Sequence, residues 1–128
     1  MNEMIISLGS NMAQGEYNMR GAMVTIEAFA ASARFSPIYE SDDASAHATP
    51  GSPRYKNCVG IIKTPLAVDE WTVRFKQLER EAGRTEAMRR AGCVPLDIDV
   101  VSCNGEVLRP KDFEKEYFRR GMEMIGGI

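Results

Sequence analysis

Cysteine and histidine are scarce in this chain of 128 residues, and their scarcity argues against several kinds of site. The three cysteines are odd in number and show no Cys-x-x-Cys spacing, so we expect neither a disulfide framework nor a zinc site. The single histidine, His47, cannot build a histidine-rich metal centre, and its position in a loop suggests no role. Cysteine usage of this kind fits a reducing compartment and predicts a cytoplasmic protein.

The chain also lacks an excess of basic charge and any long apolar run. Lys and Arg number 16 against 18 Asp and Glu, and only 8% of the residues are aromatic. This balance argues against binding to nucleic acid, which needs a basic surface and, for RNA on a sheet, exposed aromatic side chains. No apolar stretch is long enough to span a bilayer, and the start Met1-Asn2-Glu3 lacks the basic residues of a signal peptide. We therefore expect no nucleic-acid or membrane partner, and no protein partner is evident.

The sequence does contain the apolar residues of one folded unit, and we expect a single domain over residues 1–128. Hydrophobic residues make up 44% of the chain, which is enough for a core. Apolar and β-branched runs indicate strands, and apolar residues at helical spacing indicate helices. We expect strands at 4–8, 33–39, 55–64 and 96–103, and helices at 16–31, about 71–82 and 112–124.

The order of these elements, β-α-β-β-α-β with a tail, predicts an α+β fold of the ferredoxin-like type. Such a fold has a mostly antiparallel sheet with both helices on one face, and we expect the other face to be free for a ligand. Asn104-Gly105 predicts a tight turn after the last long strand. Residues 42–54 and 84–95 show no periodicity, so we expect irregular structure there.

Two aspartates in the last long strand are the strongest chemical signal. In Leu96-Asp97-Ile98-Asp99-Val100-Val101 the side chains alternate, so Asp97 and Asp99 share one face. Neighbouring carboxylates repel each other, and a hard divalent cation completed by phosphate oxygens removes that conflict. The alternative is a pair of solvated carboxylates on an edge, but aspartate is depleted in strands, which favours a metal site.

Four short motifs follow one another in a defined order. Gly9-Ser10-Asn11 ends the first strand, Tyr55-Lys56-Asn57 opens the third, Gly83-Arg84 follows the second helix, and Leu96-Asp97-Ile98-Asp99 opens the fourth strand. In this order and spacing they resemble the 6-hydroxymethyl-7,8-dihydropterin pyrophosphokinase family of folate biosynthesis. The resemblance extends from about residue 4 to residue 122.

The resemblance implies an activity and a set of site residues. The activity is transfer of pyrophosphate from ATP to the hydroxymethyl group of the pterin, with release of AMP. It implies that two Mg²⁺ ions lie at Asp97 and Asp99, and that these aspartates act with Arg84 in catalysis. For substrate binding it implies Asn57 and Tyr55 at the pterin, and Glu79, Arg84, Arg89 and Arg90 at ATP.

Taken alone, several of these residues have a plainer interpretation. Asn57 could simply be a polar residue on an edge strand. Tyr55 could be a core aromatic residue whose ring also reaches the rim of a pocket. Glu79 would be a solvated surface charge. Arg84 would compensate the dipole at the end of a helix.

The chain departs from the family pattern just before the aspartates. Where the family has Arg-Trp-Gly-Pro-Arg, this chain has Ala91 for the tryptophan and Val94 for the second arginine. A Pro-His pair is absent because Pro110 is followed by Lys111, and Met122 replaces a stacking aromatic residue. These departures keep a second hypothesis open, that of a catalytically weak or inactive module that binds a nucleotide or pterin on a ferredoxin-like fold.

Overall fold

The computed structural model describes residues 1–42 and 54–126. His47 and all but the ends of the expected loop at 42–54 lie outside the described residues. The elements are β1 (Asn2–Ser10), α1 (Gly15–Phe29), β2 (Ser32–Phe35), β3 (Tyr39–Ser41), β4 (Tyr55–Thr64), α2 (Val68–Glu81), α3 (Glu86–Arg90), β5 (Asp97–Cys103), β6 (Glu106–Val107), α4 (Pro110–Phe113) and α5 (Glu116–Met124).

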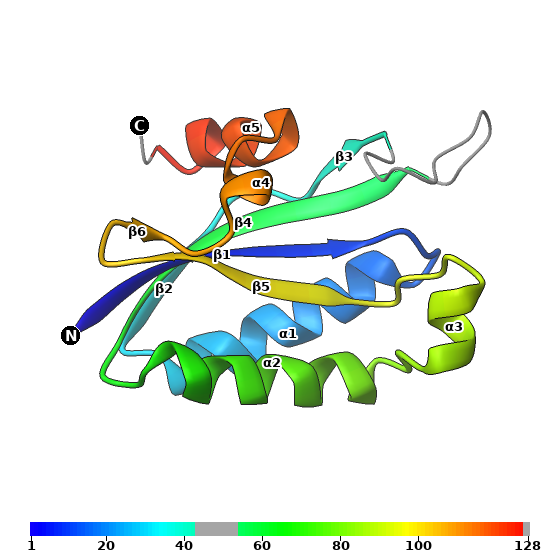
Figure 1. Cartoon of the computed structure of the whole chain (residues 1–128), viewed down its shortest axis with the longest axis horizontal. Helices are drawn as coiled ribbons and strands as arrows, with labels where there is room; N and C mark the ends of the chain where they lie inside the picture. The colour runs from blue at the N-terminus through cyan, green and yellow to red at the C-terminus, as the bar shows by residue number, and fades with distance from the viewer. Residues whose placement is uncertain (43–53, 127–128) are drawn as a thin grey trace.

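One six-stranded sheet organises the chain and confirms the α+β, ferredoxin-like expectation. Its order is β2-β4-β1-β5-β6, β3 pairs with β4 as well, and the pairs are antiparallel. The first strand is therefore central, between β4 and β5. Figure 1 shows α1 and α2 against one face of this sheet, and α4 and α5 against the other.

The main core lies between the sheet and the two long helices. Alternation on β1 turns Met4, Ile6 and Leu8 toward the helices, where each is at most 2% exposed. From α2, Trp71 and Phe75 pack on the same core with their rings 5.5 Å apart. The indole nitrogen of Trp71 donates to the buried hydroxyl of Thr64 at 3.0 Å, so the polar edge of the ring is satisfied.

Two of the expected elements are wrong in detail. The strand expected at 33–39 is divided into β2 and β3, because Pro37 has no backbone N–H and Ser36 bonds to Val59 in place of regular pairing. The irregular segment expected at 84–95 contains the short helix α3, whose first turn is capped by the Thr85 hydroxyl accepting from Met88 N–H.

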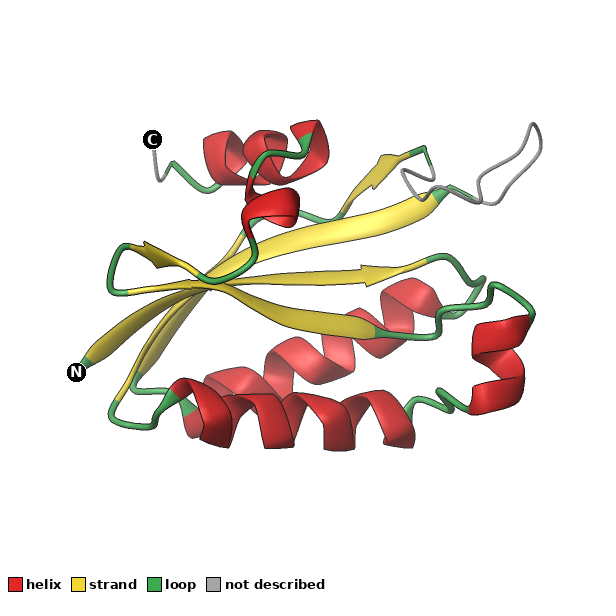
Figure 2. Cartoon of the chain, viewed as in Figure 1, coloured by secondary structure: helices red, strands yellow, loops and turns green. Residues whose placement is uncertain are grey.

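The C-terminal segment differs most from expectation. The helix expected at 112–124 is two helices, α4 and α5, and they cover part of the face that we expected to be free (Figure 2). A second apolar cluster lies beneath α5 and includes Val59, Val101, Phe118 and Met122. Met122 is thus a core residue of α5. Among the described residues, no helix is both long and apolar enough to cross a membrane.

Gly121 allows α5 to approach the sheet. A Cβ atom at Gly121 would overlap Val59 and lie 2.5 Å from the hydroxyl oxygen of Tyr39.

We expect Gly121→Ala to lower the free energy of unfolding by about 1–3 kcal/mol, because the helix must move away from β4. Gly21→Ala is the matched control: it lies in α1 with open space around it. That change should raise stability by about 0.5–1 kcal/mol. Equal effects in urea unfolding would contradict the close approach.

Candidate active site

The floor of the site is a row of residues across three adjacent strands. Gly9 on β1 pairs with Asn57 of β4 on one side and with Asp97 of β5 on the other. One step along, Ser7 pairs with Asp99. Because Gly9 has no side chain, the space between the amide of Asn57 and the carboxylate of Asp97 stays open.

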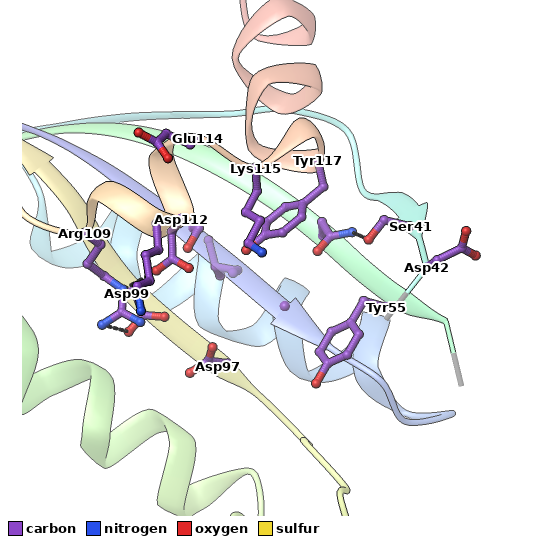
Figure 3. Close-up of a pocket in the computed structure, with 15 residues that line it drawn as sticks. Ser41, Asp42, Tyr55, Asp97, Asp99, Arg109, Asp112, Glu114, Lys115 and Tyr117 are labelled. Atoms are coloured by element: carbon purple, nitrogen blue, oxygen red, sulfur yellow. Dashed lines mark hydrogen bonds and ion pairs between the residues drawn. The ribbon is translucent and has the colours of Figure 1, made fainter. Parts of the chain in front are cut away.

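One cavity opens above this floor, and a second adjoins it at Asp97 and Asp99. The first, which we call the α5 cavity, has a volume of about 610 Å³ and is lined by residues of β3, β4 and α5 (Figure 3). The second, which we call the α2 cavity, has a volume of about 680 Å³ and runs along α2 and α3. Both volumes suit a small organic ligand. Three residues line both cavities: Asp97, Asp99 and Arg109.

The expected placement of the two aspartates on one face is confirmed. Leu96, Ile98 and Val100 point into the core and are at most 7% exposed, so Asp97 and Asp99 point the other way, toward the cavities. Each carboxylate lies beside an arginine. Arg84 contacts Asp97 at 2.8 Å, and Arg109 contacts Asp99 at 3.7 Å.

Burial raises the pKa of Asp99 to about 7, and the charge of Asp97 adds to the rise, whereas Arg109 opposes it. The two carboxylates offer hard oxygen donors, which fit a magnesium ion. Among the described residues no group of three or more His, Cys, Asp or Glu side chains forms a complete metal site. Any metal bound here would therefore take its other ligands from a substrate or from water.

Glu79 and Arg84 join α2 to the start of β5 inside the α2 cavity. Glu79 accepts from the backbone N–H of Ile98 at 2.9 Å and from Arg84 at 3.1 Å. Its side chain is 12% exposed, and burial raises its pKa. Glu79 is thus not the solvated surface charge of the plainer interpretation. Arg84 faces Asp97 and Glu79 together, which exceeds what compensation of a helix dipole requires.

The two arginines of α3 have different surroundings. Arg89 lines the α2 cavity. Arg90 lies one helical turn from Glu86, at 3.7 Å, and lines neither cavity. The structure therefore brings Arg89 to the other predicted nucleotide residues, and leaves Arg90 on the outside of α3 with its side chain 77% exposed.

Ser10 and Asn11 hold the segment between α3 and β5. The Ser10 hydroxyl and the Asn11 backbone N–H both donate to the carbonyl of Val94, at 2.8 and 3.1 Å. The Asn11 side chain accepts from Val94 N–H and donates to the carbonyl of Gly92. The Gly-Ser-Asn motif thus supplies an open floor and an anchor for the segment that follows α3, the helix of Arg89.

In the α5 cavity, Asn57 is 5% exposed and its amide nitrogen donates to the Ser41 hydroxyl at 2.7 Å. Figure 3 shows Tyr55 and Tyr117 pointing into this cavity, Tyr55 from β4 and Tyr117 from α5. Burial raises the pKa of Tyr117 to about 12, and Asp112 adds to the rise.

Tyr117 was absent from our sequence prediction, as were Arg109, Asp112 and Lys115, which also line the α5 cavity. The turn at Asn104-Gly105 sends the chain back along β5, and the backbone N–H of Arg109 donates to Val101. Extending the hairpin register pairs Arg109 with Val100, whose side chain faces the core, so the register alone does not predict the contact of Arg109 with Asp99. No sequence pattern indicated the return of α5 over β4.

Comparisons with known proteins agree with this arrangement. Residues 5–125 match the model of the 7,8-dihydro-6-hydroxymethylpterin-pyrophosphokinase family. The chain is 30% identical over 111 residues to a 2-amino-4-hydroxy-6-hydroxymethyldihydropteridine pyrophosphokinase of Aquifex aeolicus, covering 87% of this chain and 67% of that protein.

Two plant proteins are also similar. The chain is 33% identical over 100 residues to a folate synthesis bifunctional protein of Arabidopsis thaliana, and 30% identical over 100 residues to a mitochondrial one of Pisum sativum. Each alignment covers 77% of this chain but only 20% and 19% of the plant proteins. The chain thus spans about a fifth of the length of these two relatives.

The raised pKa of Asp99 predicts a dependence of stability on pH in metal-free buffer. A carboxyl group whose pKa is higher in the folded than in the unfolded chain takes up a proton on folding between the two values. Its contribution therefore favours the folded state below about pH 4 and is lost as the pH rises to about 7. We expect Asp99→Asn to stabilise the protein at pH 7.5 relative to wild type, and to gain less at pH 4. Urea unfolding at both pH values measures this, and a pH-independent difference would contradict it.

Proposed function

Since the chain belongs to the 7,8-dihydro-6-hydroxymethylpterin-pyrophosphokinase family, we propose that it transfers pyrophosphate from ATP to the hydroxymethyl group of 6-hydroxymethyl-7,8-dihydropterin. AMP is the second product, and the step belongs to folate biosynthesis. One observation supports this most: two cavities of ligand size meet at Asp97 and Asp99. A reaction that joins two substrates needs such a junction, because the acceptor hydroxyl and the transferred phosphorus must lie close together.

In this proposal the α5 cavity takes the pterin. The amide of Asn57 offers a donor and an acceptor, which suits the mixed polar edge of a pterin ring. Tyr55 and Tyr117 supply flat apolar surface for a planar ligand. Gly9 leaves room for the ring between Asn57 and the aspartates.

The α2 cavity takes ATP. Arg84 and Arg89 face this cavity and attract its phosphates, whereas Glu79 holds Arg84 in place through their contact at 3.1 Å. The family resemblance also implies Arg90 at ATP, and a role there requires the Arg90 side chain to leave Glu86. Arg109 lies at the junction of the cavities, where it balances negative charge on the phosphoryl group being transferred.

Asp97 and Asp99 are the residues that would hold divalent cations, which we take to be two Mg²⁺. When bound, such cations neutralise charge on phosphoryl oxygens and lower the pKa of the attacking hydroxyl. The aspartates then need not act as bases. Their own task is to fix the position of the cations on a rigid strand between the two substrates.

A binding module without turnover is the second candidate function. The absence of an arginine at Val94 favours it, because charge aimed at the phosphates from that segment is lost. Arg109 and Lys111 oppose it. Both line the α5 cavity, so they bring positive charge toward the aspartates from the side opposite to Val94. Cytoplasmic location, a single domain and the absence of macromolecular partners stay predictions.

The test combines turnover with two binding measurements. With ATP, the dihydropterin and Mg²⁺, we expect AMP release that depends on both the pterin and the metal. Asn57→Ala should weaken pterin binding by roughly ten- to hundredfold while a non-hydrolysable ATP analogue binds as before. Asp97→Asn should weaken Mg²⁺-dependent binding of the analogue by roughly tenfold or more.

Asn2→Ala is the control for these variants, since Asn2 hydrogen-bonds Leu66 at the far end of the sheet. It should change neither affinity. Binding of both ligands to wild type without AMP release would favour the binding module. Failure of wild type to bind the pterin would contradict the proposed function.

Arg89 and Arg90 form a matched pair for testing the α2 cavity. We expect Arg89→Ala to weaken binding of the ATP analogue by roughly two- to fivefold, because an exposed cation contributes modestly to a charged ligand. Arg90→Ala should leave that affinity unchanged, since Arg90 lines neither cavity. Titration calorimetry of both variants decides between them, and a larger loss in Arg90→Ala would reverse the assignment.

A further inference from the structure

Five residues join β3 to α5, and we call them the β3–α5 clasp: Tyr39, Glu40, Tyr117, Arg120 and Gly121. The hydroxyl of Tyr39 on β3 donates to the backbone carbonyl of Tyr117 on α5 at 2.5 Å. In the reverse direction, the guanidinium of Arg120 on α5 donates to the backbone carbonyl of Glu40 at 3.2 Å. Each element thus binds the backbone of the other through one side chain.

Packing reinforces these two hydrogen bonds. The guanidinium of Arg120 lies over the ring of Tyr39, 5.1 Å from its centroid, which adds a cation–π contact. Because Gly121 has no side chain, the hydroxyl of Tyr39 can reach the backbone of α5. Tyr39 is 8% exposed, and burial, with Cys58 adding to it, raises its pKa. The hydroxyl therefore keeps its proton and remains a donor at physiological pH.

The clasp acts on the wall of the α5 cavity. Tyr117 lines this cavity, and it stands in the first turn of a helix of nine residues. The backbone N–H groups in the first turn of a helix have no acceptor within the helix, so this turn is held less firmly than the middle, and the bond from Tyr39 to the Tyr117 carbonyl adds a tertiary contact there. Neither Tyr39 nor Arg120 lines the α5 cavity. The bond of the Tyr39 hydroxyl to the Tyr117 carbonyl is the direct link between the clasp and the α5 side of the cavity wall.

The same strand also holds the opposite side of the cavity. Tyr39 pairs with Asn57 across β3 and β4, and Ser41, two residues further on, accepts from the Asn57 amide. One three-residue strand is thus bonded both to the residue that reads the polar edge of a ligand and to the residue that covers its face. Loss of the Tyr39 hydroxyl would release Tyr117 but keep the bond between Ser41 and Asn57.

We propose that Tyr39 and Arg120 are positioning residues, and that the β3–α5 clasp sets the affinity of the α5 cavity for the pterin by fixing Tyr117. This inference rests on the proposed function of that cavity. It concerns pterin binding alone, because neither hydrogen bond of the clasp involves a residue that lines the α2 cavity.

Tyr39→Phe is the main test, because it removes the hydroxyl and keeps the ring. We expect the Kd for 6-hydroxymethylpterin, the oxidised form of the substrate, to rise roughly three- to tenfold. The KM for the dihydropterin should rise in parallel, whereas the KM for ATP and the Kd for an ATP analogue stay at their wild-type values. Arg120→Met, at an exposed position, should shift pterin affinity in the same direction by roughly two- to fivefold.

Thr64→Val is the matched control for a general loss of stability. It removes another buried hydroxyl that is bonded to an aromatic residue, Trp71, at the far end of β4. Its melting temperature should fall about as much as that of Tyr39→Phe, with no change in pterin affinity. A loss of pterin affinity in Thr64→Val equal to that in Tyr39→Phe would overturn the inference.

Two further outcomes are distinct. If wild type binds the pterin and Tyr39→Phe and Arg120→Met bind it equally well, the proposed function stands and the clasp inference is wrong. If wild type binds no pterin, the proposed function fails and the inference falls with it. Should Tyr39→Phe not fold, Arg120→Met decides the matter, because Arg120 is exposed and joins the clasp only through its bond to Glu40 and its contact with the Tyr39 ring.

Discussion

Repulsion between two carboxylates on one face of β5 is the constraint around which the site is arranged. Asp97 and Asp99 cannot move apart, because the strand fixes their spacing and Leu96, Ile98 and Val100 fix their orientation. Each is balanced by an arginine from a different direction: Arg84 comes from the end of α2 and Arg109 from the segment after β6. Arg84 also pairs with Glu79, and Arg109 also pairs with Asp112, so the two aspartates lie in a network of opposite charges at the place where the two cavities meet.

Much of this arrangement was predictable because its signals are local. Alternation placed Asp97 and Asp99 on one face, and Pro65 together with the β-branched run gave β4 its observed bounds. Asn104-Gly105 gave the hairpin. These patterns depend on neighbours within a few residues, so the sequence carries them without knowledge of the tertiary structure.

What escaped prediction depends on contacts between distant segments. The amphipathic pattern after residue 110 indicated helix but not the face of the sheet it would cover, so Tyr117 and the clasp were missed. The effect of the substitutions before the aspartates also depends on a contact between distant segments. The side chains of Ser10 and Asn11 bind the backbone atoms of Gly92 and Val94, so the segment keeps its anchor whatever side chain residue 94 has. The loss of an arginine there changes charge, not the path of the chain.

The central position of β1 also governs when the protein becomes competent during its synthesis. This strand leaves the ribosome before the other described strands, and Ser7 pairs with Val59 and Asp99, which emerge much later. Until then Met4, Ile6 and Leu8 have no sheet to join, and unpaired apolar strands are prone to aggregate. The floor needs β5, and the α5 cavity also needs α5, which is made later still. The nascent chain therefore has no partial site to offer, and such distant pairings slow folding.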